Sequence, residues 1–175
     1  MPHVMLDIET LDTTPTSVVL SVGVCKFDPR NKNEPHAKTL WRPNIEEQTD
    51  KGRTVSEATL EWWSKQDASV RESTFTEEGR IPLDQMFKEL NSYLTGSTKI
   101  WCQGPQFDMV ILEDMFRQFN HHTNWSFWQI MDSRTLFNLM PKDPRKDIQQ
   151  DAHDAAEDAF WQAVAVQRSY AHFRI

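Results

Sequence analysis

Two carboxylates stand two residues apart at the end of the first apolar run of the chain. The run reads VMLDIET and spans residues 4–10. As a β-strand it would place Met5, Asp7 and Glu9 on one face, because side chains alternate with period two. Acids on a buried strand are costly unless a cation pairs with them. We expect a divalent metal as that cation, although a strand end that meets solvent would also explain this pair alone.

A third acid, Asp108, lies on the first turn of a helix that we predict to follow Gly104-Pro105. Gly104 permits an unusual backbone and a close approach, and Phe107 can anchor the helix in the core. Taken alone, Asp108 has the simpler explanation that a first-turn acid complements the helix dipole.

The start of the last predicted helix carries His153 and Asp158, with two alanines, Ala155 and Ala156, among the residues between them. Five residues turn an ideal helix by about 140°, so the two side chains would flank a site. His153 could also precede the first full turn. The small alanines would let a backbone or a substrate come close. A capped, solvated helix start with a surface histidine is the alternative.

Three strands and three helices are predicted in the first half of the chain. The apolar segments 4–10, 17–27 and 37–41 have short connections, which predict an antiparallel meander. Segment 44–53 is expected to be a polar loop. Helices are expected over 54–66, with a capping box from Thr54 to Glu57, over 69–75, and from Pro82 to just before Gly96.

Strands and helices alternate in the second half. We expect strands at 99–103 and 125–131, helices after Gly104-Pro105, over 133–140 and from about Ala152 to His172, and a charged loop at 141–150. This order predicts the α/β class, with a mixed five-stranded sheet flanked by helices. In such sheets the site forms beside the C-terminal ends of the parallel strands, where Glu9 would lie.

Length and composition indicate one domain over residues 1–175. Cys25 and Cys102 lie in apolar segments, so free thiols in a reducing cytoplasm are expected. The sequence has no apolar run of membrane-helix length and no signal-peptide pattern. We therefore expect a cytoplasmic protein, in the host cytoplasm if it is phage-encoded. The net charge of −7 argues against a long nucleic-acid footprint, unless positive charge is supplied locally by metal or a small basic patch.

The acids and the histidine together follow the order of one family. The motifs Asp7-Ile-Glu9-Thr10, Gly104-x-x-Phe107-Asp108 and His153-x-x-x-x-Asp158 resemble those of the DEDDh exonucleases in the DnaQ-like, RNase H-like superfamily. The resemblance covers residues 4 to about 160. The segments TVSEATLEWWSKQ, WCQG and DSRTL are most similar to the exodeoxyribonuclease VIII group, which includes phage exonucleases and a mycobacterial exoribonuclease. Gln103 departs from the Asn that relatives more often carry there, which affects expected substrate contacts.

The resemblance implies an RNase H-like fold and a metal-dependent 3′–5′ exonuclease. Asp7, Glu9, Asp108 and Asp158 would hold two Mg²⁺ or Mn²⁺ ions, and His153 would take the proton from the attacking water. The reaction would release 5′-mononucleotides from a free 3′ end of DNA or RNA. A short 3′ end needs only a small footprint, which answers the charge objection.

Substrate contacts are predicted at Thr10, Leu11, Phe107, Trp63 and Arg134. Trp62 and Trp63 are adjacent on a helix, so one is expected in the core and at most one on a base. A basic cluster could hold phosphates, with a solvated loop as the simpler interpretation. It comprises Arg134, Lys142, Arg145 and Lys146.

Two other functions stay open at this point. One is a nuclease restricted to short oligonucleotides or nucleotide-like phosphodiesters, which an acidic surface would suit. The other is a catalytically silent nucleic-acid-binding module on the same fold, which would not require four acids and a histidine. A homo-oligomer is a further candidate assembly, and DNA and RNA, as single strands or duplex, all stay open as substrates.

Overall fold

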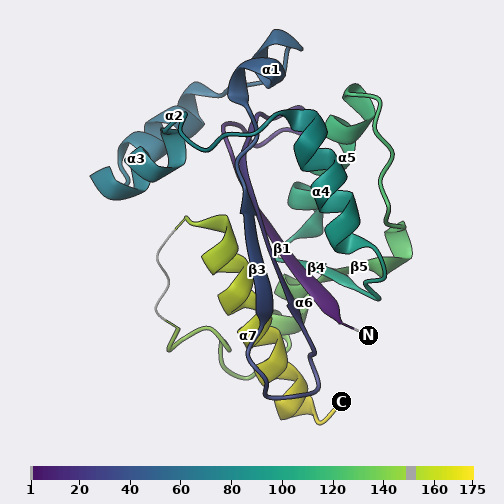
Figure 1. Ribbon diagram of the computed structural model, residues 1–175. Coiled ribbons are helices and arrows are strands. Elements are labelled where there is room, and N and C mark those ends of the chain that lie inside the picture. Colours follow the sequence, from purple (N-terminus) through teal and green to yellow (C-terminus); the bar gives the residue numbers. More distant parts are fainter. Residues whose placement is uncertain (1, 149–152) are drawn as a thin grey trace.

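The protein is built on a mixed five-stranded sheet, as the sequence predicts. The computed structural model describes residues 2–148 and 153–175. The strands are β1 (His3–Thr10), β2 (Val19–Phe27), β3 (His36–Trp41), β4 (Ile100–Cys102) and β5 (Ile130–Asp132). They lie in the order β3-β2-β1-β4-β5 (Figure 1). The first three form the antiparallel meander, and β4 and β5 run parallel to β1.

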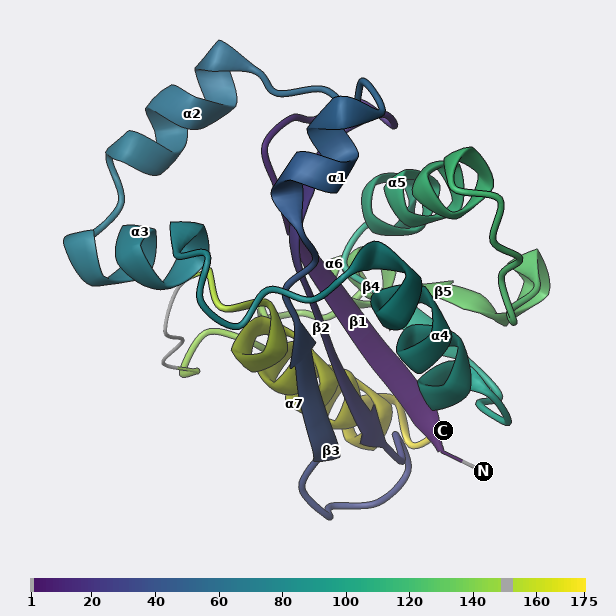
Figure 2. The same cartoon turned by 45° about the horizontal axis from the view of Figure 1, so that its top comes forward.

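Helices cover both faces of this sheet (Figure 2). Their bounds are α1 (Ile45–Asp50), α2 (Glu57–Ser64), α3 (Ala68–Phe75), α4 (Leu83–Leu94), α5 (Pro105–Gln118), α6 (Ser133–Asn138) and α7 (Ala155–Phe173). Helices α4 and α5 lie on one face and α7 on the other, while α1 to α3 extend beyond the end of the meander (Figures 1 and 2). Within the described residues, no helix is long and apolar enough to cross a membrane.

Strand β1 lies in the middle of the sheet and separates two apolar clusters. Leu6 and Ile8 belong to the cluster under α4 and α5, whereas Met5 belongs to the cluster under α7. The alternation predicted from the sequence is therefore correct. It places Asp7 and Glu9 on the face covered by α7.

Gly23 lets the start of α7 approach this face. It is the residue of β2 that pairs with Asp7. A Cβ at Gly23 would lie 2.1 Å from the carbonyl carbon of Ala155 and 2.2 Å from the amide nitrogen of Ala156. Only glycine permits this contact, so the first turn of α7 lies directly beside Asp7.

The polar loop expected at 44–53 is wrong, because α1 forms there. Asn44 caps this helix by accepting from the backbone nitrogen of Glu47. Gln48 is buried, and its amide bonds both the nitrogen and the oxygen of Val19, at 2.7 and 2.9 Å. The polar residues thus stabilise a helix by satisfying backbone groups, which a reading of polarity alone does not foresee.

The strand expected at 125–131 is wrong over most of its length. Residues Phe127–Gln129 form a 3₁₀ turn, and β5 starts only at Ile130. Ser126 and Gln129 form a reciprocal capping box that closes this turn. The local hydrogen bonds therefore override the β-propensity of the aromatic residues.

Two helix starts also differ from the prediction. Ser56, not Thr54, caps α2, because Thr54 pairs with the loop before β2 through Thr16 and Val18. Helix α7 begins at Ala155, and Asp154 caps it. The predicted start near Ala152 lies outside the described residues. Cys25 and Cys102 are buried free thiols, as expected.

Candidate active site

The end of β1 is tied firmly to α2. The backbone nitrogen of Ser56 donates to the oxygen of Leu11 at 2.9 Å, and the indole nitrogen of Trp63 donates to the oxygen of Thr10 at 3.0 Å. These bonds fix the backbone that follows Glu9.

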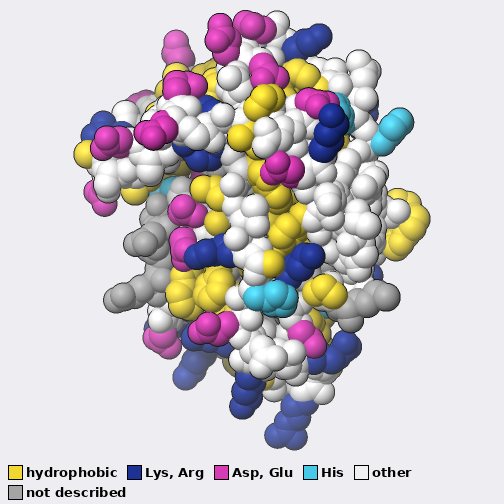
Figure 3. Space-filling model, in the orientation of Figure 1, with side chains coloured by type: hydrophobic (Ala, Val, Ile, Leu, Met, Phe, Trp, Pro, Cys, Tyr) yellow, Lys and Arg dark blue, Asp and Glu magenta, His cyan; other side chains and the backbone are white. Residues whose placement is uncertain are grey.

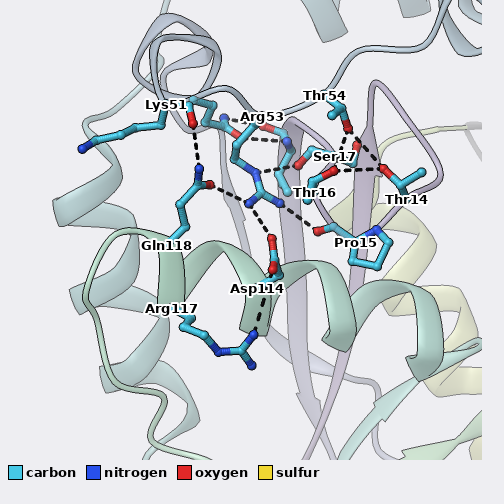
Figure 4. A network of polar contacts seen from close by, with 12 residues as sticks. Thr14, Pro15, Thr16, Ser17, Lys51, Arg53, Thr54, Asp114, Arg117 and Gln118 are labelled. Atoms are coloured by element: carbon cyan, nitrogen blue, oxygen red, sulfur yellow. Dashed lines mark hydrogen bonds and ion pairs between the residues drawn. The ribbon is translucent and has the colours of Figure 1, made fainter.

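A buried arginine supports this junction from behind. The Arg53 guanidinium donates to the carbonyl oxygens of Ser17 and Pro15, and it pairs with Asp114 on α5 at 3.0 Å (Figure 4). Gln118 of α5 accepts from the same guanidinium at 3.0 Å. The loop after β1 and the segment before α2 are thereby both attached to α5.

The four predicted metal ligands converge at the end of β1. Asp108 is 5% exposed, and its Oδ1 accepts from the backbone nitrogen of Ile8 at 3.1 Å. One carboxylate atom each of Glu9 and Asp158, together with a ring nitrogen of His153, lie within 4.8 Å of one another. Asp7 is close enough to the other three acids for their charges to raise its pKa.

His153 lies on the turn before α7 and not on the helix itself. Its φ is +74°, and the following residue, Asp154, is the N-cap. Asp158 is on the first turn of α7, where its backbone nitrogen donates to the oxygen of Asp154 at 2.8 Å. The expectation that His153 could precede the first full turn is confirmed.

The surroundings of the four carboxyls disfavour their ionised form and raise their pKa values. Burial, followed by the charges of Asp108, Glu9 and Asp158, raises the pKa of Asp7 well above its ordinary value. Burial and neighbouring acids raise the pKa of Glu9 to about 9 and that of Asp158 to about 6. Burial also raises the pKa of Asp108 to about 7. Four such groups require a cation to ionise together.

The oxygen atoms present fit a hard divalent cation. Asp158 Oδ1 is buried and has no hydrogen-bond partner among the residues that the structure describes. A buried carboxylate oxygen without a donor is rare in folded proteins. Carboxylate oxygens are the ligands that Mg²⁺ and Mn²⁺ prefer, so the donor set suits these ions.

A cavity of about 430 Å³ opens beside Glu9. Its lining includes the predicted substrate residues Thr10, Phe107 and Trp63. Trp63 is only 2% exposed and packs in a core cluster that also contains Leu11. Trp62 is 42% exposed and lines the same cavity. Of the two tryptophans, Trp62 therefore offers the open surface.

Both tryptophans also touch the histidine. The rings of Trp62 and His153 meet edge to face with centroids 4.7 Å apart, and Trp63 lies 5.8 Å from the same ring. Helix α2 thus contacts the catalytic candidate directly. The sequence singles out the tryptophans but not this contact.

The predicted basic cluster divides into residues with different surroundings. Arg134 donates to the oxygen of Gln103 at 3.0 Å, and its charge lowers the pKa of Asp108 against the effect of burial. The Arg145 side chain donates two hydrogen bonds to Asp143 and covers the ring of Phe137. Lys146 lines a cavity of about 350 Å³ that also reaches Asp158 and Gln162.

Two residues that shape the site were not predicted from the sequence. Gly23 allows α7 to approach Asp7, and Gln162 donates to Asp7 Oδ1 at 3.1 Å. A glycine inside the valine-rich segment 17–27 is a recognised signal of close backbone approach. Gln162 lies one helical turn after Asp158, a spacing that places both on one face.

The mixed five-stranded sheet flanked by helices has the fold of solved DEDDh exonucleases, and the chain is a nuclease. Residues 2–170 match the 3′-5′ exoribonuclease Rv2179c-like domain, and the chain belongs to this family. The resemblance deduced from the motifs is confirmed. Among curated proteins, none matches the chain in sequence.

Solved structures share the fold at low sequence identity. Exonuclease X in complex with 5′ overhanging duplex DNA has a TM-score of 0.62 and 11% identity, over 99% of this chain and 93% of that one. The nuclease domain of 3′hExo, a DEDDh family member bound to rAMP, has a TM-score of 0.63 and 10% identity, over 98% and 92%. The zinc-bound E. coli exonuclease I–ssDNA complex has a TM-score of 0.63 and 13% identity, over 99% of this chain but 40% of that one.

Proposed function

We propose that this protein is a divalent-metal-dependent 3′–5′ exonuclease that releases 5′-mononucleotides. Asp7, Glu9, Asp108 and Asp158 would hold two Mg²⁺ or Mn²⁺ ions. The observation that carries this proposal is the convergence of these acids beside His153, with a buried Asp158 oxygen that has no partner in residues 2–148 and 153–175. A silent binding module would have no need for this costly arrangement of charge.

When bound, the ions would supply charge stabilisation at the attacking and leaving oxygens of an in-line displacement. His153 would act as general base. Burial lowers the pKa of its imidazole, so the ring is neutral near pH 7 and can accept a proton. It would take the proton from the water whose oxygen attacks the terminal phosphorus. The bond from phosphorus to the 3′-oxygen of the preceding nucleotide breaks, and that oxygen gains a proton.

The cavity beside Glu9 would receive the terminal nucleoside. Its walls include Thr10, Phe107 and Trp62, with both polar and aromatic surface. Aromatic side chains bind bases by stacking in a way that tolerates any sequence. The family to which the chain belongs is described as exoribonuclease, so RNA is the substrate to test first.

The test is a time course with 5′-labelled single-stranded RNA and DNA of equal sequence, in Mg²⁺ or Mn²⁺. We expect a ladder of products that shorten one nucleotide at a time from the 3′ end. The variant Asp108→Asn keeps an acceptor for the Ile8 nitrogen but removes a charge, and should lower the rate about 10³-fold, or about 4 kcal/mol.

The matched control is Asp84→Asn, an exposed acid on α4 that pairs with Lys88. It should cleave at the wild-type rate. Absence of 3′ shortening on both substrates would refute the proposed activity. An Asp108→Asn variant as active as the wild type would refute the site.

A preference for short oligonucleotides is the second candidate. Acidic side chains gather on the upper part of the molecule, over α1 to α3 (Figure 3). The acids of α1 and α2 include Glu46, Glu47, Asp50, Glu57 and Glu61. They would repel a long phosphate backbone. Comparing kcat/KM for chains of about 3 and about 20 nucleotides, at several salt concentrations, separates the two candidates.

A further inference from the structure

Gln162 is a buried amide that makes one side-chain hydrogen bond among the residues that the structure describes. It is 7% exposed and follows Asp158 by one turn of α7. Its Nε2 donates to Asp7 Oδ1 at 3.1 Å. Its Oε1 is buried and has no partner within the described part of the chain.

The donated bond fixes one oxygen of Asp7. The other groups that act on this carboxyl are Asp108, Glu9 and Asp158, whose charges repel it, while the Gln162 bond favours the ionised form. Rotating the amide by half a turn would set its oxygen against the carboxylate, so the donor must face Asp7. Gln162 therefore holds the carboxylate in one orientation.

Gln162 borders the same space as Asp158. Both residues line the cavity of about 350 Å³ that Lys146 and Gln103 also reach. Asp158 Oδ1 also lacks a partner among the described residues. A buried acceptor without a donor is unfavourable, so this space suits a cation or O–H donors. A Mg²⁺ ion that keeps part of its hydration shell brings both.

We propose that Gln162 is a positioning residue for the metal centre. It would orient Asp7 by donating to one oxygen, leave the other oxygen available to the cation, and accept from the cation's hydration shell through its own carbonyl. The inference rests on the proposed metal-dependent function. It adds a residue that touches neither the substrate nor the reacting atoms.

The experiment measures Mn²⁺ affinity by electron paramagnetic resonance, without substrate, for Gln162→Met and the wild type. Methionine keeps the length and removes both polar atoms. We expect Mn²⁺ to bind roughly 10–100-fold more weakly, as for other partners of metal ligands. With saturating Mn²⁺, kcat should fall while KM stays within about twofold, because the substrate cavity beside Glu9 is unchanged.

The matched control is Gln167→Met, the same exchange on the same helix. Gln167 donates to the backbone oxygens of Asp28 and Asn33, away from the site. This variant should bind Mn²⁺ as the wild type does. Asp7→Asn serves as the reference for loss of a ligand.

A second variant covers the case in which Gln162→Met does not fold. Gln162→Glu keeps the shape but replaces the donor with a carboxylate oxygen. It should lower kcat at saturating Mn²⁺ roughly tenfold without weakening Mn²⁺ binding, since an added negative charge attracts the cation. A general packing defect would lower kcat and weaken Mn²⁺ binding together.

The Mn²⁺ measurements on the Gln162 variants can fail independently of the exonuclease assay. If the wild type binds Mn²⁺ tightly but shortens no nucleic acid, the proposed function fails and the affinity comparison still tests Gln162. If folded Gln162→Met binds Mn²⁺ within about twofold of Gln167→Met, or if Gln162→Glu keeps the wild-type kcat, the positioning role is wrong.

Discussion

His153 has a local environment that suits a general base and constrains its replacement. The left-handed backbone at φ +74° turns the chain into α7, and two indole rings border the imidazole. Burial lowers its pKa, so the ring is unprotonated at neutral pH. Asparagine and histidine tolerate a positive φ better than alanine does. His153→Asn is therefore a cleaner probe than His153→Ala.

We predict that His153→Asn lowers kcat roughly 10²–10⁴-fold, the usual contribution of a general base. Mn²⁺ affinity should fall less than in Asp158→Asn, because His153 is expected to act on water and Asp158 on the cation. Single-turnover kinetics and Mn²⁺ titration check the two parts. An equal loss of Mn²⁺ affinity in both variants would make His153 a ligand and contradict its role as base.

Helix α2 touches both the cavity beside Glu9 and the histidine. Trp63 attaches the helix to the end of β1 by donating to the Thr10 oxygen, and Trp62 lines the cavity and contacts the His153 ring. Because the Arg53 network holds the segment before α2 to α5, the helix has a fixed position relative to Asp108 (Figure 4). A base bound against Trp62 would thus lie at a set distance from the catalytic groups.

Trp62→Ala should raise KM and lower kcat, together reducing kcat/KM by about tenfold. Loss of one stacking surface is worth roughly 1–3 kcal/mol. Trp62→Phe should recover most of this loss, since a ring remains. The control is Trp128→Ala, an equally drastic change at a tryptophan that is 64% exposed and outside the cavity lining. If both alanine variants lose the same activity, the effect is not specific to the site.

The contact between β2 and α7 sets the position of Asp158 relative to Asp7. Gly23→Ala would place a methyl group 2.1 Å from backbone atoms of Ala155, which cannot move as a side chain can. We expect a loss of roughly 1–3 kcal/mol or more in the free energy of unfolding, together with weaker Mn²⁺ binding. Chemical denaturation measures the free energy of unfolding, and metal titration measures the Mn²⁺ affinity.

Gly52→Ala is the control for this change. A Cβ there meets open space, although its φ of +82° imposes backbone strain. It should lower stability while leaving Mn²⁺ affinity unchanged. If Gly23→Ala also leaves Mn²⁺ affinity unchanged, the close approach of α7 is not what forms the metal site.

For the molecule as a whole, the acid cluster couples stability to pH and metal. Glu9 keeps its proton up to a pKa of about 9 in the folded protein, against 4.5 ordinarily, and Asp108 up to about 7, against 3.8. The folded state then binds more protons than the unfolded chain between these values. The contribution of these groups to stability is greatest below the unfolded pKa values and declines as pH rises towards the folded ones.

We therefore predict that Mg²⁺ or Mn²⁺ raises Tm more at about pH 8 than at about pH 5.5, because the cation must displace protons at the lower pH. Thermal scans at both pH values, with metal and with chelator, measure the difference. The increment should shrink in Asp108→Asn. A metal-induced rise in Tm that is equal at both pH values would contradict the coupling.

The sequence alone predicted the class of the fold, which is confirmed, and named the candidate catalytic residues. Period-two alternation in residues 4–10 placed Asp7 and Glu9 on one face, and motif order pointed to Asp108, His153 and Asp158. These features are local or linear, so they can be read without coordinates. The errors at α1 and before β5 arose where side chains such as Gln48 and Ser126 bond backbone groups that polarity does not reveal.

Only the tertiary structure decided how the set is held together. Asp7 and Gln162 are separated by 155 residues in sequence, and Gly23 is opposite Ala155. Such contacts depend on strand register and helix docking, which local propensity does not encode. Which of the two tryptophans has a ring open to a base likewise became clear only from the burial of Trp63 and the exposure of Trp62. The sequence thus named the candidate residues, and the packing of α2 and α7 against β1 and β2 brings them together, because burial and close approach are properties of the folded chain.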